Sequence, residues 1–268
     1  IQAAAYQDDR GVYVDAEAVE GDAQSGFTFD GQPVDRSFGK MGKSLKNSVT
    51  PDDMYASYGA DTLRLYEMSM APITQDRPWE TRSVVGSQRL LQRVWRTMVD
   101  EETGALTLGD DAPSDDLVRV LHKTIDGVRA DMDNLRFNTA IAKLTELNNE
   151  VTKVDGPTPR AVADAMVRML APLVPHMAEE LWHKLGGDGS VVWAEFPEAD
   201  PALLVDDQVE LPVQVKGKVR GRIMVAPDAS EDDVVAAALA EENVAIHVDG
   251  ADLRKVIYVP GRMVNLIV

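Results

Sequence analysis

Apolar residues recur every three or four positions through the middle of the chain, which is typical of amphipathic helices. One predicted helix follows Ser114, a residue suited to an N-cap, and a second begins near Asn138. A third begins at Thr158-Pro159, and Pro172 and Pro175 should kink or split it because proline interrupts helical hydrogen bonding. Three amphipathic helices with short connections predict a helical bundle. Their apolar stripes are Leu117, Leu121, Ile125, Val128, Met132, Ile141, Leu144, Leu147, Val151, Val162, Met166, Met169, Leu173, Met177, Leu181 and Leu185.

Shorter helices are predicted before this bundle. Thr50-Pro51 supplies an N-cap followed by proline at the first helical position, and Gly59 ends that helix. Further helices are expected over residues 61–70 and 79–98. The second of these has one apolar face, formed by Val84, Leu91, Val94 and Met98. Residues 106–113 are rich in Gly, Asp and Pro and predict a loop.

Both ends of the chain instead show strand signals. Near the start, Val12–Val14 and Phe27–Phe29 predict strands, and Asp30-Gly31 predicts a hairpin turn. After residue 208, valines alternate with polar residues around Lys216-Gly217, which predicts a second hairpin. Ser230 then begins a helix, and strands return over 256–259 and 263–268. The tail is therefore expected to form a small α+β domain.

Composition excludes several kinds of site. The chain has no cysteine, which excludes disulfides, thiolate metal sites and a cysteine nucleophile, and its four histidines are scattered. No apolar run is long enough for a membrane span and no secretory signal heads the sequence, so we expect a cytoplasmic protein without a membrane partner. The first residue is Ile, so we expect either processing or a piece of a longer protein.

The net charge of −18 conceals one basic segment. Residues 36–96 carry a net charge of +4, whereas residues 1–35, 97–207 and 208–268 carry −7, −13 and −2. The acidic total argues against nucleic acid as a partner, because phosphate binding requires local positive charge. The uneven distribution is nevertheless compatible with nucleic-acid binding at the basic segment.

The most informative stretch is Lys40-Met41-Gly42-Lys43-Ser44. Its last three residues end like a P-loop, but Ser37 occupies the position of the first P-loop glycine, so a P-loop is not favoured. Two lysines on a glycine-containing loop suit the triphosphate of ATP, where charge moves onto departing pyrophosphate. From spacing alone, a solvated basic loop is the simpler interpretation.

The sequence of this loop resembles the Lys-Met-Ser-Lys-Ser signature of class I aminoacyl-tRNA synthetases. Further stretches are similar to the stem-contact region and helical domain of the subclass that charges Leu, Ile, Val and Met: residues 45–51, 58–64, 137–140 and 170–182. The tail is more specific, because residues 213–221 and 254–261 resemble the C-terminal domain of bacterial leucyl-tRNA synthetases. The resemblance extends from about Ile1 to Val268.

Two features depart from this family. Gly42 replaces the middle serine of the signature, which removes a hydroxyl, keeps both lysines and Ser44, and gives the backbone more freedom. The second ATP signature of the family, His-Ile-Gly-His, is absent from this sequence, as are the first half of the nucleotide-binding fold and the editing domain. The resemblance therefore implies the C-terminal portion of a leucyl-tRNA synthetase, which we expect to be inactive alone.

The resemblance also implies a mainly α, multidomain fold. Residues 1–50 would form the end of a Rossmann-type catalytic core, with a β-rich segment and the signature loop. Residues 51–112 would be stem-contact helices, and residues 113–190 a helical bundle similar to class I anticodon-binding domains. Residues 191–207 would be a linker, and residues 208–268 an α+β tRNA-binding domain.

For the complete protein, the resemblance implies a leucine–tRNA ligase that forms leucyl-adenylate from ATP and transfers leucine to tRNA(Leu). Lys40 and Lys43 would be catalytic, stabilising charge on the β- and γ-phosphates. ATP, with its Mg²⁺, would be bound by Lys40, Met41, Gly42, Lys43 and Ser44. No metal ligand is expected in this chain, and most leucine contacts would lie outside it. Two alternatives stay open: a catalytically silent tRNA-binding module, or the same region of an Ile, Val or Met synthetase.

Two groups of basic residues are candidate tRNA contacts. The first group lies at helical spacings beside an apolar stripe: Arg89, Arg93 and Arg96. The second occupies alternate hairpin positions: Lys216, Lys218, Arg220 and Arg222. We expect this second group to share one face without acids, opposite a face formed by Val213, Val215, Val219 and Val225. In both cases an ordinary solvated polar face is the alternative interpretation.

Two further residue types are expected to be structural. The tryptophans are Trp79, Trp95, Trp182 and Trp193, and we expect them to be packing anchors rather than base-stacking platforms. His176 and His183 could face the same way, but a metal site is not favoured because the sequence shows no Cys or carboxylate partner for them. Packing in the core or at a helix N-terminus is the preferred interpretation.

Overall fold

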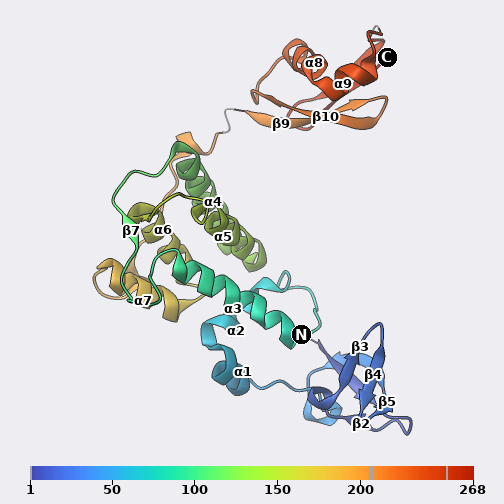
Figure 1. Ribbon diagram of the computed structural model, residues 1–268, viewed down its shortest axis with the longest axis vertical. Coiled ribbons are helices and arrows are strands. Elements are labelled where there is room, and N and C mark those ends of the chain that lie inside the picture. Colours follow the sequence, from blue (N-terminus) through green and yellow to red (C-terminus); the bar gives the residue numbers. More distant parts are fainter. Residues whose placement is uncertain (1, 206–207, 252) are drawn as a thin grey trace. The chain divides into compact units, whose positions relative to one another are not determined.

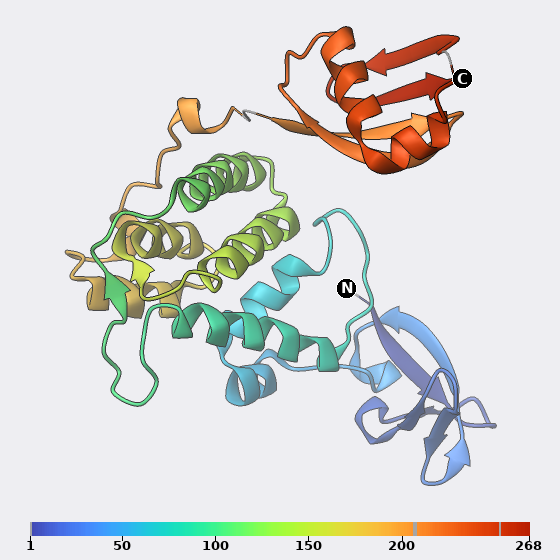
Figure 2. The same ribbon diagram turned by 45° about the horizontal axis from the view of Figure 1, so that its top comes forward.

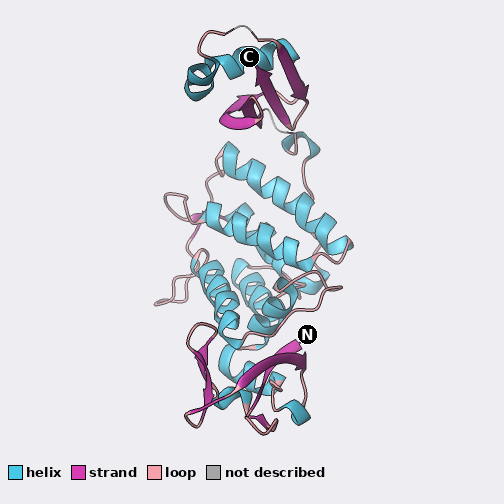
Figure 3. Cartoon of the chain, turned by 90° about the vertical axis from the view of Figure 1, so that its right-hand side faces the viewer, coloured by secondary structure: helices cyan, strands magenta, loops and turns pink. Residues whose placement is uncertain are grey.

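The computed structural model describes residues 2–205, 208–251 and 253–268. The chain divides into two compact units, Ile1–Asp200 and Pro201–Val268 (Figure 1). Helices fill the middle of the chain, and most strands lie before the first helix or in the second unit (Figure 3). Each unit has its own buried apolar core. This layout agrees in outline with a helix-rich chain that ends in an α+β domain.

The first strands form two small sheets, in the orders β2-β1-β6 and β3-β4-β5. The strands are β1 (Gln2–Gln7), β2 (Tyr13–Val14), β3 (Glu20–Asp22), β4 (Gly26–Phe29), β5 (Gln32–Pro33) and β6 (Asp35–Lys40). The strands predicted at Val12–Val14 and Phe27–Phe29 are confirmed. Asp30-Gly31 makes the expected turn between β4 and β5, with positive φ angles of 50° and 74°. The antiparallel pairing of β1 with β6 brings the start of the chain beside the signature loop.

Three helices follow the loop, and the first of them begins and ends at the capping residues seen in the sequence. They are α1 (Pro51–Tyr58), α2 (Ala60–Ser69) and α3 (Thr81–Arg96). The Thr50 hydroxyl accepts the Asp53 backbone N–H at 3.3 Å, and Gly59 ends α1 at a φ of 85°. On α3, Val84, Leu91 and Val94 are buried, which confirms the predicted apolar face.

The bundle contains α4 (Asp115–Asp133), α5 (Phe137–Val151), α6 (Arg160–Leu170) and α7 (Pro175–Leu185). Ser114 caps α4 by accepting the Leu117 N–H, as expected. The third predicted helix is split into α6 and α7, because Pro172 and Pro175 interrupt it and Pro175 begins α7. The core combines residues of all four helices with Leu91 and Val94 of α3. The split, one of the two outcomes expected from these prolines, gives the bundle four described helices in place of three.

Short strands and turns complete the first unit. β7 (Leu108–Gly109) lies in the predicted loop and pairs in parallel with β8 (Thr158–Pro159). The 3₁₀ turn η3 (Val191–Trp193) follows α7, and a second, η4 (Pro201–Leu203), begins the next unit. No helix in the described ranges is long and apolar enough to cross a membrane.

The segment expected to be a linker, residues 191–207, begins as part of the bundle. Val191 is buried, and the Arg129 guanidinium lies 4.9 Å from the Phe196 ring centroid. Arg129 also donates to the carbonyls of Phe196 and Pro197 at 3.3 and 3.0 Å. Arg129 therefore binds the segment around Phe196 to α4, and residues 191–200 belong to the first unit. Sequence periodicity missed this contact because the segment is irregular.

The second unit is one four-stranded sheet with two helices on one face (Figure 2). Its elements are β9 (Val209–Val215), β10 (Lys218–Val225), α8 (Glu231–Ala240), α9 (Glu242–Val248), β11 (Lys255–Val259) and β12 (Met263–Ile267). The strand order is β10-β9-β12-β11, with β9 and β12 parallel and the other pairs antiparallel. Ser230 accepts the Asp233 N–H at 3.2 Å and begins α8 as predicted. The break between α8 and α9 was not predicted.

Candidate functional site

The Lys40–Ser44 loop connects β6 to η2 (Lys43–Leu45), another short 3₁₀ turn. Lys40 is the last residue of β6, and Lys43 is the first of η2. Lys40, Lys43 and Ser44 are exposed, whereas Met41 and Gly42 are half-buried. Two ammonium groups are thus free to meet an anionic ligand, while the backbone between them is partly enclosed by the protein.

Asn47, a residue to which the sequence analysis gave no role, holds this loop in place. It is only 4% exposed, and its Oδ1 accepts the Gly42 N–H at 3.0 Å. Its Nδ2 donates to the Ala3 carbonyl on β1 at 3.3 Å. A buried amide that is satisfied at both ends fixes the groups it joins, because breaking either bond leaves a buried polar atom unpaired. Asn47 therefore ties the loop backbone to the β1–β6 sheet.

Gly42 does not need glycine's conformational freedom here. Its φ of −179° and ψ of 153° are extended values that any residue adopts. A Cβ at this position would lie 4.0 Å from the Lys40 carbonyl oxygen and the Ser44 Oγ, which are its nearest neighbours. The serine that the signature usually has here would fit without strain. The departure from the family pattern therefore leaves the shape of the loop unchanged.

Two stretches that resembled the same family, about 110 positions apart, meet beside the bundle. Asp61 on α2 is 9% exposed and accepts the backbone N–H groups of His176 and Met177 at 3.3 and 2.7 Å. Arg64, one turn later, donates to the carbonyls of Pro172 and Leu173. Asp61 thus satisfies the free N–H groups at the start of α7, and Arg64 binds carbonyls in the break that precedes it. These contacts dock α2 onto the bundle.

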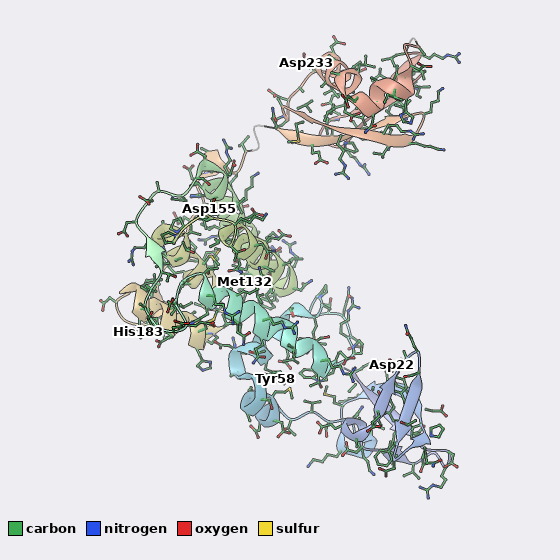
Figure 4. The ribbon with its side chains drawn as sticks, viewed as in Figure 1. Asp22, Tyr58, Met132, Asp155, His183 and Asp233 are labelled. Atoms are coloured by element: carbon green, nitrogen blue, oxygen red, sulfur yellow. The ribbon has the colours of Figure 1, made fainter. Side chains whose placement is uncertain are left out.

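His176 lies at the start of α7, which is one of the two positions expected from the sequence, and not in the core. Its Nδ1 lies 2.9 Å from Asp61 Oδ1, and its side chain is 75% exposed. His183, labelled in Figure 4, lies 3.9 Å from Glu179 on the same helix. Within the described residues, no group of three or more His, Cys, Asp or Glu side chains is arranged to hold a metal ion.

Arg89, Arg93 and Arg96 lie on the exposed side of α3. Arg93 donates to the Asn149 side chain on α5, and Arg96 pairs with Glu101 at 2.9 Å. Arg93 and Arg96 also line a surface cavity of about 530 Å³ between α3 and the end of α5. The Arg96–Glu101 pair is solvent-exposed and so contributes roughly 0–1 kcal/mol, which makes it easy to exchange for a phosphate. The structure therefore brings two of these arginines to one cavity and leaves Arg89 beside it on the same helix.

The four basic residues of the C-terminal hairpin do not share one face, so this prediction is wrong. The register of β10 shifts between Val219 and Gly221, and Arg220 is the extra residue of a bulge. Lys218 lies opposite the buried Val215, whereas Arg222 lies opposite Pro212 on the other face. Lys216 occupies the turn, with a φ of 51°.

The same bulge explains two further corrections at this hairpin. Val219, expected on the packed face, is 56% exposed, because the bulge reverses the inward and outward alternation on its two sides. Arg222 forms an ion pair with Glu210, so its face is not free of acids. Val213, Val215 and Val225 are buried as predicted. The hairpin therefore offers basic groups in several directions rather than one flat surface.

The tryptophans divide into two classes. Trp79, Trp95 and Trp182 are half-buried, and Trp79 packs edge-on against Tyr66 with a centroid separation of 5.0 Å. Trp193 is 85% exposed, so the expectation that it is a packing anchor is wrong. Its neighbour Val191 enters the core instead, because a three-residue 3₁₀ turn points successive side chains in different directions.

Known proteins similar to this chain agree with the motifs. The model of the anticodon-binding domain of tRNA ligase matches residues 115–236. A leucine–tRNA ligase of Saccharopolyspora erythraea is 60% identical over 269 residues, which is all of this chain and 28% of that protein. The leucine–tRNA ligase of Streptomyces coelicolor is 56% identical, again over all of this chain and 28% of the relative. The chain resembles the C-terminal portion of leucyl-tRNA synthetases. It spans about 28% of the length of these relatives.

A solved structure is similar as well. The ternary complex of Agrobacterium radiobacter K84 agnB2 LeuRS with tRNA and LeuAMS matches at a TM-score of 0.66 and 27% identity. The match covers 85% of this chain and 31% of the LeuRS chain. The leucyl-tRNA synthetase resemblance drawn from the loop and the tail is therefore confirmed by sequence and by fold.

Proposed function

We propose that this chain is the part of a leucine–tRNA ligase that supplies the pyrophosphate-stabilising loop and docks tRNA(Leu). The observation that carries the proposal is the pair of exposed lysines, Lys40 and Lys43, on one loop. Asn47 hydrogen-bonds the backbone of this loop to β1 and so fixes its position. The similarity of the whole chain to leucine–tRNA ligases supports this assignment.

In this proposal, leucine attacks the α-phosphate of ATP, leucyl-adenylate forms and pyrophosphate departs. Lys40 and Lys43 stabilise the charge that gathers on the β- and γ-phosphates in that step. Gly42 and Ser44 complete the loop around the phosphates, and Met41 packs near the adenine. Mg²⁺ would come with ATP as part of the substrate, and we assign none of its ligands to side chains of this chain.

The second step, transfer of leucine to tRNA(Leu), requires the RNA to be held. The candidate contacts are Arg89, Arg93 and Arg96 on α3 and the basic residues of the C-terminal hairpin. Phosphate contacts of this kind position RNA without reading its sequence. The strongly acidic stretch 97–207, at −13, is a poor phosphate-binding surface, so these basic groups are the favoured sites.

A chimera tests the proposal directly. The matched C-terminal 28% of the Saccharopolyspora erythraea ligase is replaced by this chain, and both half-reactions are measured. We expect ATP–pyrophosphate exchange and charging of tRNA(Leu), with exchange lost in a Lys40→Ala, Lys43→Ala double variant of the chimera. A folded chimera that exchanges equally well with and without the two lysines would contradict the loop assignment.

The alternative is a tRNA-binding module without chemistry of its own. ATP–pyrophosphate exchange separates the two hypotheses when it is measured on this chain and on the chimera. If the ligase hypothesis is correct, exchange occurs in the chimera and not in the 268-residue chain alone. A chimera that docks tRNA but never forms the adenylate would favour the module.

A further inference from the structure

The outer strand β6 presents a row of three side chains that the proposed chemistry does not fully use. In the β1–β6 register, Arg36 lies opposite Tyr6, Phe38 opposite Ala4, and Lys40 opposite Gln2. Alternate residues of a strand point to the same side, so Arg36, Phe38 and Lys40 share one face. All three are exposed, and Phe38 is 50% exposed although it is a large apolar side chain.

The row alternates cation, aromatic ring and cation. The Arg36 guanidinium carbon lies 5.2 Å from the Phe38 ring centroid and 4.6 Å from that of Phe27. In the part of the chain that the structure describes, neither Arg36 nor Lys40 forms an ion pair with a carboxylate. The β1 residues opposite the row carry no acidic side chain. Asp35, the nearest acid along β6, points to the other face of the strand.

This combination fits one class of ligand better than others. Exposed aromatic rings between cations bind single-stranded nucleic acid, because a base stacks on the ring and its phosphates meet the charges. A double helix keeps its bases stacked on each other and offers no free base to Phe38. Arg36 and Lys40 lie four residues apart on the strand, about 13 Å, one on each side of Phe38. A cation therefore lies on each side of a base that stacks on Phe38.

We infer that the Arg36–Phe38–Lys40 face of β6 binds a single-stranded stretch of RNA, with one base stacked on Phe38. The inference rests on the proposed function, which makes tRNA the partner of this chain. It adds a docking face on the sheet that carries the signature loop, so the unpaired strand and the ATP loop share Lys40. Phe38 and Arg36 are RNA contacts in this inference and take no part in the chemistry.

Fluorescence anisotropy on the 268-residue chain tests the inference with a labelled single-stranded RNA tetranucleotide and, separately, with tRNA(Leu). Phe38→Ala should weaken tetranucleotide binding by roughly 5- to 100-fold, the range expected for one stacked base. Phe38→Trp should retain binding. The matched control is Val12→Ala, because Val12 is also apolar and 51% exposed in the same β-rich segment. Arg36→Gln should flatten the salt dependence of binding by about 0.7, the value of one phosphate contact to a single strand.

Three outcomes would overturn the inference. The first is an equal loss of tetranucleotide binding in Phe38→Ala and Val12→Ala, and the second is a duplex RNA that competes as well as a single strand. The third is displacement of the RNA by ATP in the wild-type chain together with weaker ATP binding in Phe38→Ala. The last result would make a free nucleotide the occupant of the face. Failure of tRNA(Leu) itself to bind this chain or the chimera would count against the proposed function. Normal tRNA binding by the wild-type chain, with no change in RNA affinity in Phe38→Ala, would count against this inference alone.

Discussion

Asp61 and Met177 are 116 positions apart, yet the Asp61 carboxylate accepts the Met177 backbone N–H at 2.7 Å. The same carboxylate also contacts the His176 backbone N–H and ring, so one side chain of α2 satisfies the free N–H groups at the start of α7. A carboxylate at this end of a helix is further favoured by the helix dipole. The contact makes the segment after the signature loop continuous with the bundle.

Replacing Asp61 by Asn should destabilise the first unit by about 1–2 kcal/mol, because a buried, charge-assisted helix cap becomes a weaker neutral one. Urea unfolding followed by circular dichroism measures the change. Asp52→Asn is the matched control, since Asp52 is an exposed acid in the first turn of α1. Equal effects of the two substitutions would show that the Asp61 contact adds no stability beyond that of an exposed acid in the first turn of a helix.

Lys43→Ala in the chimera should lower the rate of adenylate formation by roughly 10²–10³-fold and leave leucine binding nearly unchanged. The physical reason is that a group facing charge that develops in the transition state stabilises that state more than the bound substrate. Rapid-quench measurement of adenylate formation and titration of leucine binding separate the two effects. Lys46→Ala is the control, because Lys46 is exposed on the same loop outside the signature. A proportional rise in the leucine Kd with an unchanged chemical step would refute the assignment of Lys43.

Asn47→Ala should release the signature loop. The Gly42 N–H would lose its acceptor and the Ala3 carbonyl its donor, so the Gly42 amide should exchange with solvent faster. A loss of about 1–3 kcal/mol in the free energy of local opening is expected for an unsatisfied buried group. Hydrogen exchange read by NMR on this chain gives the value directly. Ser48→Ala, an exposed neighbour, should leave the Gly42 amide protected.

Asp131 on α4 gives the bundle an acid-sensitive contact. Burial raises the pKa of this carboxyl, but hydrogen bonds from Lys143, Thr139 and Arg136 lower it more, so its pKa lies below the usual 3.8. The side chain is only 4% exposed, and Arg136 Nε lies 2.8 Å away. A group whose pKa is lowered on folding stabilises the protein above its unfolded pKa, and that contribution is lost as the pH falls through the folded value.

Asp131→Asn should therefore cost stability at pH 7, and this cost should shrink as the pH falls below the usual carboxyl pKa of 3.8, because the pKa of Asp131 is lowered on folding. Urea midpoints from pH 2 to 7 for both proteins measure this convergence. Asp133→Asn is the control, because Asp133 is exposed near the end of the same helix. Parallel curves for wild type and Asp131→Asn over the whole range would contradict the assigned ion pairs.

The bulge at Arg220 changes what is expected of RNA binding by the hairpin. Four phosphate contacts on one face would have given a salt slope of up to roughly −3 to −4, but the four residues point in different directions. Lys218→Ala should flatten the slope of tRNA affinity against salt by about 0.9, the value of one phosphate contact to a duplex stem. Arg222→Ala should do less, since Glu210 already pairs with Arg222. Affinity that is indifferent to salt in the wild-type chain would mean that this hairpin does not contact RNA.

The sequence by itself determined the elements whose signals are local. Thr50, Ser114 and Ser230 marked helix starts because a capping side chain satisfies N–H groups only two or three residues away. Pro172 and Pro175 marked the interruption between α6 and α7, and Lys216-Gly217 marked a hairpin turn because its residues adopt positive φ angles. The signature loop was also visible, since its residue types are adjacent in the chain.

The tertiary structure alone decided the contacts that join distant segments. Asn47 became the anchor of the loop only because β1 placed the Ala3 carbonyl within its reach, and no periodicity marks such a residue. The one extra residue at Arg220 reversed the faces of the hairpin, which alternation in the sequence cannot reveal because the register depends on the partner strand. The Arg36–Phe38–Lys40 row likewise appeared only when β6 paired with β1. Local hydrogen bonding is encoded within a few residues, whereas these features depend on which strand or helix the chain meets.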